Sequence, residues 1–137
     1  GVNNFSDLVD EVVIVATPDP VAIRSAEKMA ATLFEKGLRP SLLLNRMQVQ
    51  KVLEGQLHQP QTLSFTLDLP LLGALVDSGQ VYDAALKGQT AAQAEDEGVQ
   101  QELNNILKRM EGEALPVPEY QQEQLNIFQR IWKWLED

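Results

Sequence analysis

The chain has 137 residues, of which 44% are hydrophobic and 23% are charged, a composition typical of one globular domain. Its 20 acidic and 11 basic residues give a net charge of −9, which disfavours binding to nucleic acid through charge alone. The absence of cysteine excludes disulfides, thiolate zinc sites and cysteine nucleophiles. No apolar run approaches the roughly 18 residues that suggest a membrane span.

The N-terminal part of the sequence predicts one strand–helix–strand unit. Residues 11–16 form a β-branched run, and Asp19, followed by a proline, resembles a helix N-cap. Residues 21–36 place apolar side chains on one helical face, and Gly37 is suited to end that helix. Residues 38–47 predict the second strand. A unit of this kind requires a right-handed crossover and a parallel pair of strands.

The middle of the chain predicts a third strand and two further helices. Residues 48–58 indicate a weakly helical connector, and residues 62–77 begin with polar–apolar alternation and predict a strand at their leucine-rich end. A turn and a short helix over residues 81–86 should follow. A longer helix with apolar residues at helical spacing then extends through Met110, so the α/β domain is expected over residues 1–112.

The C-terminal part predicts a linker and an amphipathic helix. Residues 113–120 contain two prolines and are typical of a semi-rigid linker, and residues 121–137 separate apolar from polar side chains. The apolar side includes Phe128, Ile131, Trp132, Trp134 and Leu135, and the polar side carries Arg130 and Lys133. Such a helix fits a membrane interface, although three neighbouring carboxylates weaken its attraction to anionic lipid. Packing against the domain itself, or against another protein, is the alternative.

The sequence lacks the usual residue combinations of a catalytic site. We find no nucleophile beside a base, no paired carboxylates on one face, no metal-ligand cluster and no glycine-rich phosphate loop. The single histidine, His58, has no acidic or histidine partner at metal-ligand spacing and is expected in a solvated loop. We therefore predict no catalytic residue and no metal site in this chain.

Three segments together resemble the C-terminal half of the MinD-like, deviant-Walker P-loop ATPases, a group that includes the partitioning ATPases. They are DEVVIVATPDPVAIRSAEKM, LLLNRM and DLPLLGALVDSGQVYDAALKGQT, followed by the amphipathic tail. The resemblance implies an α/β fold, namely the C-terminal part of a three-layer, doubly wound parallel sheet of the P-loop NTPase type. Valine stands at position 76, where the family has proline, and Gly88-Gln89-Thr90 replaces Gly-x-Pro.

The resemblance also implies roles for individual residues. Asn45 would recognise the adenine ring of ATP, and Arg46 would flank the base or help to fix the loop. Val76 and Asp77 would pass along the other side of the base. Arg24 would lie near the surface used for dimerisation and for the partner that stimulates hydrolysis. The phosphate loop and the residues that hold Mg would lie upstream of Gly1, so this chain should be inactive alone and ATP with Mg would belong to the full-length protein.

The function implied by the resemblance is that of a nucleotide-switched ATPase that positions the division septum. It would bind membrane lipid through the tail helix at the cytoplasmic face of the cell membrane, form a homodimer with ATP, and meet MinC-like and MinE-like regulators. Nucleic acid is not expected as a partner. The alternatives are a non-catalytic protein-interaction module, or a related ATPase of flagellar placement or partitioning.

Overall fold

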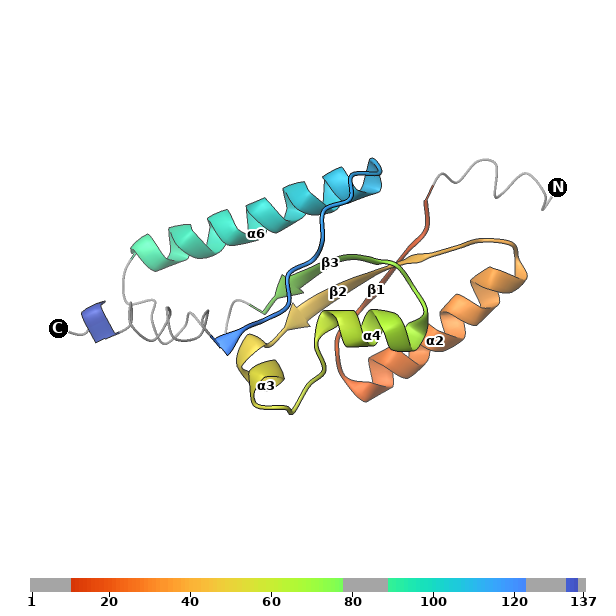
Figure 1. Ribbon diagram of the computed structural model, residues 1–137, viewed down its shortest axis with the longest axis horizontal. Helices are drawn as coiled ribbons and strands as arrows, with labels where there is room; N and C mark the ends of the chain where they lie inside the picture. The colour runs from red at the N-terminus through yellow and green to blue at the C-terminus, as the bar shows by residue number, and fades with distance from the viewer. Residues whose placement is uncertain (1–10, 78–88, 123–132, 136–137) are drawn as a thin grey trace.

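The structure is a computed structural model that describes residues 11–77, 89–122 and 133–135. In chain order its elements are β1 (Val13–Ala16), α2 (Pro20–Glu35), β2 (Ser41–Met47), α3 (Val49–Leu53), α4 (Pro60–Leu67), β3 (Leu71–Val76) and α6 (Gln89–Met110). The three strands are parallel and lie in the order β1-β2-β3. Figure 1 shows α6 on one side of the sheet and α2 and α4 on the other. The predicted α/β fold with a parallel sheet is confirmed.

Helix α2 begins and ends at the residues that the sequence indicates. The Oδ1 atom of Asp19 accepts a hydrogen bond of 2.9 Å from the backbone N–H of Ala22, and a proline occupies the first helical position. Gly37 adopts a φ of +80°, which a residue with a side chain rarely reaches, and the helix stops there. Ala26 and Ala30 are buried, and these small side chains let α2 lie close to β1.

The segment before the third strand is a helix, α4, and the strand starts only at Leu71. The third strand predicted at the leucine-rich end of residues 62–77 is confirmed, but the polar–apolar alternation at the start of that stretch does not mark extended structure. Leu63 and Leu67 are four residues apart and both are buried on one helical face, whereas Phe65 is 88% exposed. The proline at the first position of α4 favours the helix. Asp68 ends it in the left-handed conformation.

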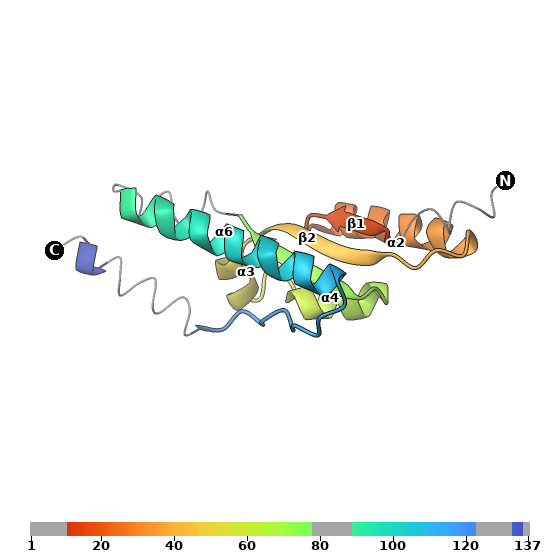
Figure 2. The same cartoon turned by 90° about the horizontal axis from the view of Figure 1, so that it is seen from above.

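The side of the sheet that carries α2 and α4 holds the main hydrophobic core. Leu42 and Leu44 of β2 are fully buried there, together with Ile14 of β1 and Ala74 of β3. Helix α6 packs against β3 on the other side, and Figure 2 shows it running along the sheet. The two elements approach closely at Gly73, where an added Cβ would lie 2.4 Å from Cγ1 of Ile106.

Residues 113–120, expected as a linker, contain no helix or strand but lie against the domain. Val117 and Tyr120 pack against the core, and the segment runs from the end of α6 towards α3 and α4 (Figure 1). In the expected tail helix, residues 133–135 are helical, whereas residues 123–132 and 136–137 lie outside the described residues. The expected helix over residues 81–86 also lies outside them. Within the described part of the chain, no helix is long and apolar enough to cross a membrane.

Candidate functional site

The carboxyl ends of the three strands meet at one edge of the sheet, and the four residues predicted to contact the nucleotide lie there: Asn45, Arg46, Val76 and Asp77. Thr17 follows β1, Asn45 and Arg46 lie near the end of β2, and Asp77 follows β3 directly. In open parallel sheets this edge is where ligands bind, because the loops that leave the strands form a crevice there. The candidate site is therefore this edge.

Asn45 and Arg46 form an irregularity in strand β2. Leu44 pairs with Ala74, and Met47 pairs with Val76, so β2 contains one more residue than β3 between the two pairs. Arg46 has a φ of +59°. The backbone N–H of Arg46 donates a hydrogen bond of 2.9 Å to Oδ1 of Asn45. A non-glycine residue in this region is strained by about 1 to 3 kcal/mol, and such strain clusters at ligand sites. The bulge thus changes the direction of the chain at Asn45, the residue predicted to bind the adenine base.

Asn45 lines a cavity of about 300 Å³ between β1 and α2. Most of the lining is apolar, and the polar side chains are Asn45, Thr17 and Ser25. The apolar part of the lining consists of Ile14, Val15, Ala16, Ala22, Ala26 and Met29. A concave, mostly apolar site with a few polar groups is typical of small-molecule binding. An amide such as that of Asn45 can both donate and accept hydrogen bonds in one plane.

Arg46 and Asp77 meet each other instead of lining this cavity. Nε of Arg46 lies 3.8 Å from Oδ2 of Asp77, and the two side chains are 69% and 18% exposed. An ion pair this exposed contributes little to stability. The backbone N–H of Asp77 also donates a hydrogen bond of 2.7 Å to the carbonyl of Met47. These contacts hold the chain after β3 beside the end of β2.

The other predicted residues that the structure describes do not line the cavity. Val76 is the last residue of β3 and is half-buried, and Arg24 is exposed on α2. In the tail, Lys133 is exposed, Trp134 is 77% exposed and Leu135 is 50% exposed. The other predicted tail residues, Phe128, Arg130, Ile131 and Trp132, lie outside the described residues. The roles assigned to all of these side chains stay predictions.

Asp19 shapes the wall of the cavity without lining it. Its carboxylate accepts hydrogen bonds from the Thr17 hydroxyl and from the backbone N–H of Ala22. These two bonds, the hydroxyl bond first, lower the pKa of Asp19 below its ordinary value. Because Thr17 and Ala22 both line the cavity, the charged carboxylate fixes the junction of β1 and α2 on which the cavity depends.

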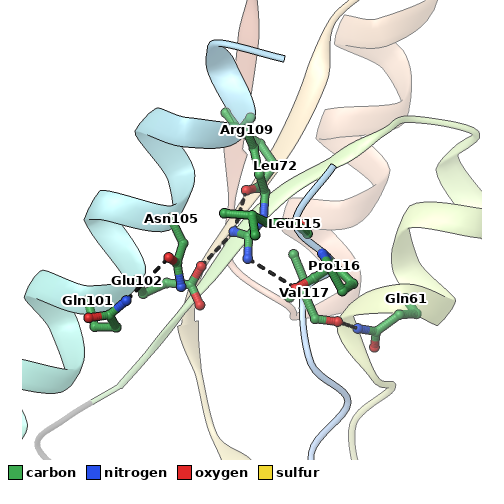
Figure 3. Close-up of polar contacts among 9 residues, drawn as sticks. All are labelled: Gln61, Leu72, Gln101, Glu102, Asn105, Arg109, Leu115, Pro116 and Val117. Carbon is green, nitrogen blue, oxygen red and sulfur yellow. Dashed lines mark hydrogen bonds and ion pairs between the residues drawn. The ribbon is translucent and has the colours of Figure 1, made fainter. Parts of the chain in front are cut away.

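Arg109, which no sequence pattern singled out, forms the centre of a part-buried polar cluster (Figure 3). Its side chain is 6% exposed and pairs with Glu102 at 2.7 Å. A cation in the last turn of a helix usually favours the helix dipole and solvent. The available signal was the spacing of seven residues, which places Glu102 and Arg109 on the same face of α6. No group of residues that could hold a metal ion occurs among the described side chains.

Comparison with known proteins gives no matching family model. The chain is 26% identical to the septum site-determining protein MinD of Synechocystis over 133 residues, which are 96% of this chain and 50% of the relative. It is 32% identical to a putative MinD of Emiliania huxleyi over 80 residues, 58% of this chain and 29% of the relative. The chain thus spans about half the length of the Synechocystis relative. It is similar to MinD proteins over most of its own length.

Solved structures show the same fold. A MinD cell division protein of Aquifex aeolicus matches with a TM-score of 0.64 and 21% identity, covering 80% of this chain and 47% of that chain. A MinC:MinD cell division protein complex of Aquifex aeolicus matches with a TM-score of 0.65 and 20% identity, covering 88% of this chain and 50% of that chain. The resemblance to the C-terminal half of MinD-like proteins is confirmed.

Proposed function

We propose that this chain is the C-terminal part of an ATP-dependent, membrane-associated switch protein that helps to place the division septum. The observation that carries the proposal is the similarity to MinD, which extends over 96% of the chain in the Synechocystis relative. The position of Asn45 in a mostly apolar cavity supports the nucleotide part of the proposal.

In this proposal Asn45 forms hydrogen bonds with the adenine base of ATP at the carboxyl edge of the sheet. Its amide can pair with the edge of an adenine ring, and the apolar lining suits a flat aromatic group. The chain spans about half the length of its Synechocystis relative, and we assign the binding of the phosphates and of Mg to the rest of the complete protein. Hydrolysis there would supply the free energy that resets the switch. The ATPase activity therefore belongs to the proposed complete protein.

The open edge of strand β1 supports the wider sheet of a P-loop NTPase. Among the described strands, β1 pairs only with β2, and Val15 on β1 is 59% exposed. The cavity beneath α2 opens next to this strand. Unpaired edges and exposed apolar side chains are costly in a soluble domain. We propose that further parallel strands continue the sheet beyond β1, as in a three-layer, doubly wound fold.

The tail helix would act as the reversible membrane contact. Lys133, Trp134 and Leu135 are exposed, as expected of a helix that does not bury this turn against the domain. One short amphipathic helix binds lipid only marginally, and two helices in an ATP-bound homodimer would bind far more tightly through avidity. The protein would then sit at the cytoplasmic face of the membrane with ATP bound and leave it after hydrolysis.

Protein partners of the MinC and MinE kind follow from the same proposal. A solved structure similar to this chain is a complex of MinC with MinD, which supports a MinC-like partner. Arg24, exposed on α2, is our candidate for the surface that meets the second protomer or a regulator.

Vesicle co-sedimentation tests the membrane part against a non-catalytic interaction module. We would compare the chain with Trp134→Glu and with Trp134→Phe as the matched control, using an excess of vesicles of phosphatidylethanolamine and phosphatidylglycerol. The proposal predicts that the parent chain and Trp134→Phe sediment and that Trp134→Glu does not. If the parent chain stays in the supernatant, or if all three behave alike, the membrane part of the proposal is wrong.

A further inference from the structure

Residues 113–120, which we call the strap, are held by glutamine side chains at the start of α4. Nε2 of Gln59 donates a hydrogen bond of 2.8 Å to the carbonyl of Tyr120, and Oε1 of Gln59 accepts one of 2.9 Å from the N–H of the same residue. Nε2 of Gln61 donates to the carbonyl of Val117. Two side chains thus bind the backbone of a segment that lies more than 50 residues later in the sequence, at separations of 61 and 56 residues.

Arg109 binds the beginning of the same strap and the edge of strand β3 (Figure 3). Its Nε donates a hydrogen bond of 2.6 Å to the carbonyl of Leu115, and its Nη2 donates one of 3.2 Å to the carbonyl of Pro116. Its Nη1 donates to the carbonyl of Leu72 on β3 at 2.9 Å and to Glu102 at 2.7 Å. Charged donors form stronger hydrogen bonds than neutral ones, and this one is buried. One guanidinium therefore joins α6, β3 and the strap.

The sequence of the strap suits a docked, extended segment. Prolines at 116 and 118 fix their own φ and favour extended structure at the residues before them, so little conformational entropy is lost on docking. An extended polyproline-like chain has about three residues per turn, which places Val117 and Tyr120 on one side. Both pack against the core, whereas Pro118 and Glu119 between them are exposed.

We propose that the strap is a fixed part of the domain and that Arg109 is the positioning residue that locks it. The chain beyond Tyr120 then leaves the domain from one place, beside the start of α4. Because the eight residues of the strap are docked, they do not increase the distance from the domain that the following segment can span. A flexible tether of the same length would leave both the position and the direction of the following segment undefined.

If the proposed function holds, the strap sets the orientation of the domain at the membrane. Lipid binding by residues 121–137 would bring the side of the domain that carries α4 towards the bilayer. This consequence rests on the proposed function, whereas the docking of the strap does not, and the two are measured separately.

Spin labels measure the docking without lipid or nucleotide. The chain has no cysteine, so Thr62→Cys on α4 and Glu119→Cys in the strap, both exposed positions, introduce the only two labelling sites. We would record the distance distribution by pulsed electron paramagnetic resonance in this labelled parent. Three further chains would carry Arg109→Ala, the pair Gln59→Ala and Gln61→Ala, or Lys108→Ala. Lys108 is the matched control, because it is the exposed neighbour of Arg109 on α6.

We expect one narrow, short distance in the parent and in Lys108→Ala, and loss of that distance in Arg109→Ala and in the double glutamine variant. Circular dichroism shows whether the helices persist in each chain. If Arg109→Ala unfolds the domain, the double glutamine variant alone tests whether these side chains hold the strap. Both glutamines bind the strap from α4, and their hydrogen bonds do not involve α6. A broad distribution in the parent, or a narrow distance that survives in the deciding variants, overturns the proposal.

Discussion

Replacing Gly73 by alanine should push helix α6 away from the sheet. A Cβ at this position would lie 2.4 Å from Cγ1 and 2.7 Å from Cδ1 of Ile106, and 3.4 Å from Cδ1 of Leu43. Carbon atoms pack at about 3.5 to 4.0 Å, so Ile106 or the whole helix must move by more than about 1 Å. Cγ1 is close to the helix backbone, and a rotation of the side-chain tip alone does not relieve the contact.

Gly73→Ala should therefore lower the free energy of unfolding. Overpacking of this kind destabilises a protein by about 1 to 3 kcal/mol. The alanine also restricts the unfolded chain, which returns about 0.4 to 1 kcal/mol where the backbone is not strained, and Gly73 is not among the glycines with positive φ. We therefore expect a net loss of about 1 to 2 kcal/mol in the free energy of unfolding, measured by urea denaturation followed by circular dichroism.

A second substitution makes the test specific. Ile106→Ala removes both clashing atoms, so Gly73→Ala should cost little or nothing in that background. Ile106→Val is the matched control, because valine retains γ-carbons near the clashing position and should not rescue. The reasoning is refuted if Gly73→Ala destabilises the parent by less than about 0.5 kcal/mol, or if its cost is the same in the parent and in Ile106→Ala.

Four further substitutions test the described contacts. Arg109→Met should lower the free energy of unfolding by about 3 to 5 kcal/mol, because it leaves Glu102 without its buried partner; adding Glu102→Leu should recover part of that loss in urea denaturation. Tyr120→Phe should stabilise the chain by about 1 kcal/mol, since the buried hydroxyl of Tyr120 has no hydrogen-bond partner in the described part of the chain, and a loss of stability would contradict this. Burial, assisted by the charge of Glu102, raises the pKa of Tyr120, so the free energy of unfolding should be independent of this group below about pH 10 and fall at higher pH, a fall that Tyr120→Phe should lack. The pKa of Asp19 is lowered in the folded chain, so its contribution is present above its ordinary pKa and is lost as the pH falls below it; thermal unfolding of Asp19→Ala should show a weaker acid dependence than the parent, and an equal dependence would refute the cap.

The first strand–helix–strand unit could be predicted from the sequence because its signals are local. The N-cap at Asp19, the glycine at position 37 and the apolar face between them each act within a few residues of one another. Helix α4 was missed because its local signals conflict. Leu63, Phe65 and Leu67 alternate like a strand, and Pro60 at the first helical position was the local signal against it; the packing of the two leucines against the core shows that the period is four and not two.

The candidate site was predicted in part. The position of Asn45 at the carboxyl edge follows from the order of the strands, whereas the bulge that turns the chain at Arg46 depends on pairing with β3. The burial of Arg109 depends on carbonyls from β3 and from the strap, which no local pattern reveals. Contacts between distant segments were therefore the part that the sequence alone did not predict.

The central claim is that the edge containing Asn45 holds the base of ATP. The most direct test is the affinity for Mg-ATP, measured by equilibrium dialysis, of the intact protein from its own cells and of its Asn45→Ala and Gln50→Ala variants. Gln50 is the control, because it is exposed on α3 and bonds to Glu54. We predict that the parent and Gln50→Ala bind alike and that Asn45→Ala binds about tenfold or more weakly, since the base loses its hydrogen bonds. Equal affinities in all three proteins, or no binding in the parent, would contradict the account.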